Sequence, residues 1–236
     1  MEQEQKQYDA VLTRSAVFAG ISPEEIHSML GCLSARYAHF HKGDFILHHG
    51  DFIQSIGLVL EGNVHILKED FWGNVNLMAE CTPGDIFGES YAIRSDVPSE
   101  VSIQAVGNTE ILFLNLHKML TTCGSSCEFH NRLIHNLIAV LSEKNFRLSK
   151  KLEHMSKRTT REKLLSYLSA EAIRQGSLEF DIPFNRQQLA DYLSVDRSAM
   201  SSELGRLQDE GYFTFHKNHF KMQEGTHAAA WVPAHG

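Results

Sequence analysis

Residues 184–211 read FNRQQLADYLSVDRSAMSSELGRLQDEG, and this pattern constrains the fold more than any other stretch of the chain. Asn185, followed three positions later by Gln188, is typical of a capping box at the start of a helix. Asp196 is a good N-cap for a second helix. Apolar residues then recur at helical spacing: Met200, Leu204 and Leu207. The stretch therefore predicts two short helices joined by a tight turn.

The second of these helices has a polar face made mostly of short side chains. Its residues are Arg197, Ser198, Ser201 and Ser202. A flat face that offers hydrogen bonds is what a recognition helix needs in the major groove of DNA. The alternative is an αα-hairpin inside a helical core. Residues 211–222 favour the first interpretation, because they alternate as two strands around a turn at residues 216–219.

Two helices followed by a β-hairpin form a winged helix-turn-helix, which predicts double-stranded DNA as a partner. We expect the polar face that begins at Arg197 to meet base edges and phosphates, and Arg186 to position the protein on a phosphate. The charge distribution agrees with this expectation. Residues 1–143 carry 8 basic and 18 acidic side chains, whereas residues 144–221 carry 14 basic and 10 acidic ones. A mildly basic end on an acidic chain suits a protein that meets phosphate at one end.

The region 37–116 is punctuated by glycine-containing turn signals with short β-prone runs between them. The signals stand at residues 43–44, 50–51, 62–63, 73–74, 84–85 and 107–108. Most of them are 7 to 12 residues apart. Turns at this spacing predict a small antiparallel sandwich or roll.

Residues 128–155 contain neither glycine nor proline and predict one long helix. One stripe of this helix steps alternately by four and three residues, which makes a heptad seam with a single asparagine. The seam consists of Ile134, Ile138, Leu141, Asn145, Leu148, Leu152 and Met155. A second stripe is expected to pack on the β-roll: Phe129, Leu133, Leu137 and Val140. Two apolar faces need two partners, so a parallel homodimer is predicted, with a core helix of a monomer as the alternative.

Two motifs resemble those of the CRP/FNR family of transcription regulators (cyclic-AMP receptor protein and fumarate-nitrate regulator). They are RQQLADYLSVDRSAMSSEL at residues 186–204 and PGDIFGES at residues 83–90, and the resemblance spans residues 18–222. It implies an α+β fold with an N-terminal jelly-roll (double-stranded β-helix) sensor, a long dimerisation helix and a C-terminal winged helix-turn-helix. It also implies an effector-responsive, non-catalytic regulator that binds a palindromic DNA site as a homodimer. RNA polymerase is a candidate partner.

The second motif resembles the opening of the family's phosphate-binding cassette, whose glutamate holds the ribose of a cyclic nucleotide. The residues expected around this pocket are Gly88, Glu89, Ser90, Arg94, Ser99 and Glu100. In cyclic-nucleotide binders, an arginine followed by serine or threonine grips the phosphate about ten residues after the glutamate. Here those positions are Ser99 and Glu100, and Arg94 comes too early unless the loop is rebuilt. We therefore expect an unidentified small effector rather than cyclic AMP, and no cofactor.

Clustered histidines and cysteines leave two other chemistries open. A cupin-type metalloenzyme is also a jelly roll with metal-binding histidines, but the histidines here adjoin turns, which favours surface positions: His39, His41, His48 and His49. Cys123 and Cys127, with His130 nearby, have a spacing that suits redox or metal sensing. The family's iron–sulfur members use an N-terminal cysteine cluster, and residues 1–31 contain no cysteine. Two unpaired thiols and no metal site are the simpler interpretation.

The predicted organisation has four parts. They are an effector-sensing β-roll at residues 1–127, a dimerisation helix at 128–156, a winged helix-turn-helix at 157–223 and a loose tail at 224–236. No apolar run is long enough to span a membrane. The first ten residues, MEQEQKQYDA, are polar and acidic, unlike a signal peptide. We expect a cytoplasmic protein without a membrane partner.

Overall fold

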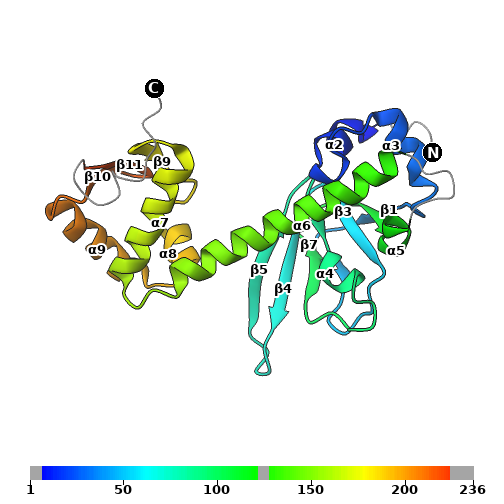
Figure 1. Ribbon diagram of the computed structural model, residues 1–236. Coiled ribbons are helices and arrows are strands. Elements are labelled where there is room, and N and C mark those ends of the chain that lie inside the picture. The colour runs from blue at the N-terminus through cyan, green and yellow to red at the C-terminus, as the bar shows by residue number, and fades with distance from the viewer. Residues whose placement is uncertain (1–6, 122–127, 224–236) are drawn as a thin grey trace. The chain divides into compact units, whose positions relative to one another are not determined.

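The computed structural model describes residues 7–121 and 128–223. The chain divides into two compact units, Met1–Ser142 and Glu143–Gly236 (Figure 1). Within the described ranges, no helix combines the length and the apolar character needed to cross a membrane.

Short helices open the first unit. They are α2 (Asp9–Arg14), the 3-10 helix η1 (Ala16–Phe18) and α3 (Pro23–Leu30). The Ser22 side chain caps α3 while Glu25 bonds back to the Ser22 backbone, which is the capping box that the sequence indicates. The sequence Ser22-Pro23-Glu24-Glu25 predicts a capped helix that runs to about Ala35, and the predicted end is wrong. The helix ends at Leu30, since Ser34 adopts a φ of +49°, a left-handed conformation that turns the chain away.

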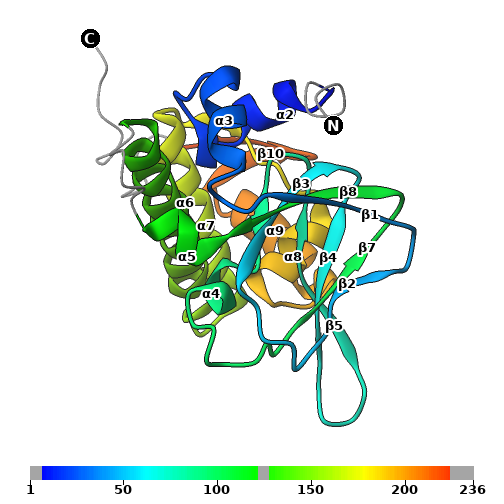
Figure 2. The same ribbon diagram turned by 90° about the vertical axis from the view of Figure 1, so that its right-hand side faces the viewer.

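In residues 7–121, eight strands build the β-roll predicted for this region (Figure 2). They are β1 (Arg36–Phe40), β2 (Phe45–Leu47), β3 (Ser55–Glu61), β4 (Val64–Glu69), β5 (Val75–Cys81), β6 (Ile86–Phe87), β7 (Ser102–Ala105) and β8 (Thr109–Asn115). One antiparallel sheet has the strand order β1-β8-β3-β6 and the other has the order β2-β7-β4-β5. Two short helices complete the roll: α4 (Glu89–Ala92) and α5 (Leu116–Leu120). The fold is thus the predicted α+β arrangement.

The chain forms two turns of the same kind, at His41–Asp44 and at His48–Asp51. Asp44 accepts a hydrogen bond from the backbone N–H of His41, and Asp51 accepts one from that of His48, each at 2.8 Å. Gly43 and Gly50 both have a φ of +91°, which explains the glycine at each turn. All four histidines singled out in the sequence are exposed, which confirms their surface position.

Helix α6 (Glu128–Met155) buries one of its predicted stripes in the roll. Leu133 and Leu137 join the roll's main core, and Phe129 and Val140 pack at its margin. Asn136 donates hydrogen bonds to the carbonyl oxygens of residues 17 and 19, which ties the N-terminal segment to the helix. The predicted packing of this stripe on the helix's own roll is therefore confirmed.

The second unit contains the helices and the hairpin predicted from the sequence. Its elements are α7 (Thr160–Gln175), β9 (Glu179–Asp181), α8 (Arg186–Leu193), α9 (Arg197–Asp209), β10 (Phe213–His216) and β11 (His219–Met222). The strands form one sheet in the order β10-β11-β9, and β9 is a third strand that the sequence pattern does not predict. One apolar core joins α7, α8, α9 and this sheet through Leu168, Leu189, Leu204 and Phe220.

His154, in the last turn of α6, is buried among side chains of the second unit. Its ring lies edge-on to Tyr167, with ring centroids 5.8 Å apart, and its Nδ1 is 2.8 Å from Ser166 Oγ. Burial lowers the pKa of His154 below its usual value of about 6.5. The neutral imidazole is therefore the form that this packing favours.

We expect His154 to make the stability of the protein depend on pH. Below about pH 6.5 the unfolded state takes up a proton that the folded state resists, so the free energy of unfolding decreases as the pH is lowered. Above that pH both states are neutral and the contribution is constant. Urea denaturation of wild type and His154→Gln at about pH 7.5 and about pH 5 measures this. The stability difference between them should shrink at the lower pH, and a constant difference would remove His154 as the cause.

Candidate nucleic-acid interface and effector cassette

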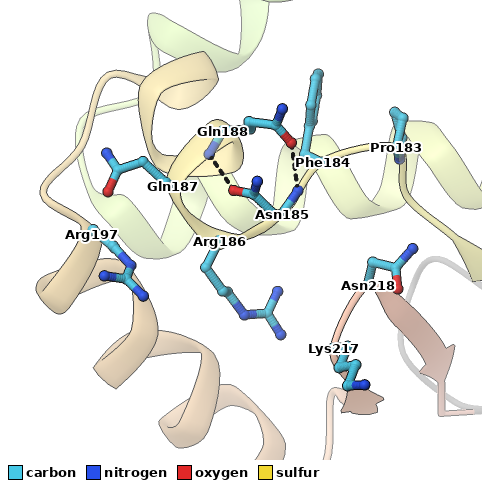
Figure 3. A pocket seen from close by; sticks show the side chains of 9 residues that line it. All are labelled: Pro183, Phe184, Asn185, Arg186, Gln187, Gln188, Arg197, Lys217 and Asn218. Atoms are coloured by element: carbon cyan, nitrogen blue, oxygen red, sulfur yellow. Dashed lines mark hydrogen bonds between the residues drawn. The ribbon is translucent and has the colours of Figure 1, made fainter.

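The local structure of α8 and α9 follows from their capping residues. Asn185 accepts a hydrogen bond from the backbone N–H of Gln188, and the Gln188 side chain accepts one from that of Asn185 (Figure 3). Ser194 ends α8 in the left-handed conformation, with a φ of +51°. Asp196 then accepts a bond from the backbone N–H of Ala199 and starts α9. These contacts confirm the predicted helix-turn-helix.

Helix α9 separates its buried and polar faces as predicted. Its core residues are fully buried: Met200, Leu204 and Leu207. The predicted DNA-reading residues are all exposed: Arg197, Ser198, Ser201 and Ser202. The Ser198 hydroxyl donates a hydrogen bond to the Asp196 carboxylate, so it takes part in the helix cap. Ser201 and Ser202 leave their hydroxyl groups on the open face.

Arg186 and Arg197 both line an open hollow of about 590 Å³ between α8, the start of α9 and the β10–β11 turn. Figure 3 shows Arg186 between Arg197 on one side and the turn residues Lys217 and Asn218 on the other. The full lining is Pro183, Phe184, Asn185, Arg186, Gln187, Gln188, Arg197, Lys217 and Asn218. The sequence predicts the two arginines for this surface but does not predict Lys217. The signal for it was a lysine at the tip of the predicted hairpin.

The cations of this hollow are not neutralised within the described part of the chain. Neither Arg186, Arg197 nor Lys217 forms an ion pair with a described carboxylate. Other arginines of the same unit do have such partners: Arg161 pairs with Glu210, Arg174 with Glu171 and Arg206 with Glu203. Three cations with no carboxylate among the lining residues are suited to hold an anion, and phosphate oxygens are suitable acceptors.

Arg161 stabilises the C-terminal end of α9. Its guanidinium, near the start of α7, pairs with Glu210 just after α9 and lies 3.4 Å from a Glu203 oxygen. It also covers the Tyr212 ring, 5.1 Å from the centroid. These contacts fix both the end of α9 and the segment that leads into the wing.

The cassette residues surround α4 and the loop that follows it. Gly88 is the N-cap of α4 and has a φ of +80°, a conformation that favours glycine. Glu89 is buried, whereas Ser90 and Arg94 are exposed. The structure therefore places the Glu89 carboxylate inside the roll and leaves Arg94 at the surface.

Ser99 and Glu100, at the positions of the family's phosphate grip, are engaged within the chain. Ser99 is buried, and its hydroxyl donates a hydrogen bond to the carbonyl of Val101 at 2.8 Å. The Glu100 carboxylate is exposed and pairs with Lys68 of β4 at 2.8 Å. The hydrogen bond from Lys68 lowers the pKa of Glu100, so this exposed carboxylate carries a negative charge.

The metal and redox hypotheses concern clustered histidines and the pair Cys123 and Cys127. The two cysteines lie outside the described residues. No group of three or more histidine, cysteine or acidic residues suited to a metal ion occurs within residues 7–121 and 128–223.

Two family models match the chain in the order in which its units occur. Residues 37–126 match the cyclic nucleotide-binding domain, and residues 162–223 match the Crp-like helix-turn-helix domain. The chain belongs to the CRP/FNR family. It is therefore a DNA-binding transcription regulator with an effector-binding domain, and such regulators are not enzymes.

The chain is similar to one protein in sequence and to two solved structures in fold. The regulator is 28% identical to the cyclic AMP receptor protein of Thermus thermophilus over 200 residues, which cover 84% of this chain and 87% of that protein. The structure of OCPA-complexed CprK has the same fold, with a TM-score of 0.60 at 15% identity, over 82% of this chain and 88% of the other. A cyclic nucleotide-binding domain from Methylobacillus flagellatus has a TM-score of 0.52 at 20% identity, over 63% of this chain and 81% of the other.

Proposed function

We propose that this CRP/FNR regulator acts as a homodimer that binds a palindromic DNA site under the control of a small effector. The observation that carries the proposal is the seam on α6. Ile138, Leu148 and Leu152 are 54%, 67% and 68% exposed, although Leu133 and Leu137 of the same helix are buried in the roll. A regular stripe of exposed leucine and isoleucine at heptad spacing is suited to a second helix.

The seam also indicates which kind of pair it forms. Asn145 is exposed within it, and a single asparagine at such a position favours a two-stranded pair in one register at some cost in stability. A parallel pair brings two winged helix-turn-helix units to the same end of the dimer. Two recognition helices about 34 Å apart then match two half-sites one DNA turn apart.

Selection of binding sites from a random duplex pool tests this proposal. We expect the enriched sequences to be inverted repeats whose half-sites are separated by about one helical turn. A single asymmetric site of half that length would contradict the dimer, and no enrichment at all would contradict sequence-specific binding. Selection repeated with host-cell extract present, then with purified fractions, would identify the effector.

The effector is proposed to act where the roll meets α6. Leu133 and Leu137 of α6 are part of the same core as the strands β3 and β8. A ligand that repacks this core shifts the helix that carries the seam, and so alters how the two DNA-binding units are presented. RNA polymerase is a proposed partner of the DNA-bound dimer.

We expect neither cyclic AMP nor cyclic GMP to be this effector. This expectation rests on Glu100, an exposed carboxylate paired with Lys68, which the resemblance to the family aligns with the phosphate grip. The repulsion between two anions weakens binding, and the arginine that usually compensates is absent at Ser99. Isothermal titration should detect no binding of either nucleotide at micromolar concentration. Micromolar affinity would contradict this role of Glu100 and would point to Arg94 as the phosphate ligand.

A further inference from the structure

Arg186 differs from the other two cations of the hollow because it is stacked on aromatic rings. Its guanidinium carbon lies 4.8 Å from the centroid of Phe215 and 5.6 Å from that of Phe220. Phe215 and Phe220 are directly paired across β10 and β11, and their rings stack with centroids 5.7 Å apart. The side chain of Arg186 thus reaches from the first turn of α8 onto the face of the wing.

The environment of Arg186 makes this stack a substantial contact. The residue is half-buried, and its burial lowers the pKa of the guanidinium, although arginine stays charged. It has no ion pair with a described carboxylate to offset that burial. The electron-rich faces of the two phenylalanine rings are therefore what stabilises the charge.

The wing turn that this contact steadies carries Lys217. Lys217 has a φ of +54°, a conformation that lysine rarely adopts, and strain of this kind often occurs at functional positions. The neighbouring Asn218 donates a hydrogen bond to the Ile182 carbonyl at 3.1 Å and accepts one from the Ile182 backbone N–H at 2.9 Å. The turn is therefore held from both sides, by Ile182 and by Arg186, with the lysine at the rim of the hollow.

We propose that Arg186 is a positioning residue for DNA binding, which acts through Lys217. By stacking on Phe215 and Phe220 it fixes the wing against α8 and so keeps Lys217 where it meets a phosphate of the DNA. A direct phosphate contact of Arg186 itself is secondary. The inference rests on the proposed function of this surface as the DNA interface.

The test uses variants that separate the stack from the charge. Phe215→Leu removes the platform and leaves every cation in place, Arg186→Lys keeps the charge without the planar stack, and Lys217→Ala removes the proposed phosphate contact. Affinity for a random-sequence duplex is measured at several salt concentrations, because phosphate contacts dominate binding to random DNA. Arg174→Met is the matched control, since this arginine is exposed in the same unit but lies outside the hollow.

We expect Phe215→Leu, Arg186→Lys and Lys217→Ala each to weaken binding about fivefold or more and to reduce the salt slope by about 0.9, the value for one lost phosphate contact. Because all three act on the same contact, Phe215→Leu combined with Lys217→Ala should bind no more weakly than Lys217→Ala alone. Arg174→Met should bind like wild type.

Two results would overturn the role of Arg186. One is wild-type affinity of the Phe215→Leu variant, and the other is a double variant whose losses multiply. Hydrogen exchange without DNA gives an independent check, because the backbone amides of β10 and β11 should exchange faster in Arg186→Lys than in wild type. Unchanged protection would also contradict the proposal. Failure of the proposed function would look different, since wild type itself would then bind no duplex in a salt-dependent way.

Discussion

Replacing Leu148 and Leu152 by glutamate should convert the protein into a monomer. Both side chains are about two-thirds exposed on the seam of α6, so the change leaves the roll intact. A dimer would lose four buried leucine side chains, each of which contributes at least about 1.5 kcal/mol. A total of about 6 kcal/mol is more than a ten-thousandfold loss in the dimerisation constant. Sedimentation velocity at micromolar protein concentration measures the mass directly.

The matched control for this experiment is Phe146→Glu. Phe146 is 57% exposed on the same helix but stands outside the heptad stripe, so this variant should remain dimeric. Leu141 is left unchanged because it packs against the core of the roll as well as belonging to the seam. A Leu148→Glu/Leu152→Glu protein that still sediments as a dimer would show that the seam does not form the interface.

The second large effect is expected at Arg197. This arginine is the first residue of α9, is exposed and lines the hollow without a described carboxylate partner. A bidentate arginine–guanine pair is worth about 1–3 kcal/mol of discrimination, or roughly 5- to 150-fold in affinity. Arg197→Ala should therefore weaken the selected site by that factor, and weaken random DNA much less. Binding curves on selected and scrambled duplexes at two salt concentrations measure both losses.

Arg206→Ala is the control on the same helix. Arg206 is exposed as well, but it pairs with Glu203 and lies outside the hollow. Its replacement should leave the preference for the selected site unchanged. Equal losses on both duplexes for Arg197→Ala would instead assign that residue to a phosphate, because a phosphate contact carries no sequence information.

The helix-turn-helix could be predicted from the sequence because its signals are local. The cap at Asn185 and the cap at Asp196 each act within three residues of the position that they stabilise. The end of α3 was misplaced because the residue that stops it, Ser34, has no strong sequence signature for a left-handed conformation. Strand β9 was missed because a three-residue strand is specified by its partner β11 rather than by its own pattern.

The functional surface was predictable only in part for a similar reason. The register of β10 and β11 sets Phe215 beside Phe220, and the packing of the wing brings both rings under Arg186. No spacing along the chain indicates that contact. The Lys68 partner of Glu100 is likewise 32 residues away in sequence, so the sequence shows a carboxylate at this position but not the charge that holds it.

Helix α6 uses one face to complete the core of the roll and leaves another open at heptad spacing. Binding events on the two faces of one continuous helix are thermodynamically linked, and such a linkage is reciprocal. An effector that tightens pairing or DNA binding by a given factor must itself be bound more tightly, by the same factor, to the paired or DNA-bound protein. The apparent affinity for the effector then depends on how much protein and DNA are present. A ligand screen on dilute, DNA-free protein would therefore underestimate the affinity of the protein for its effector.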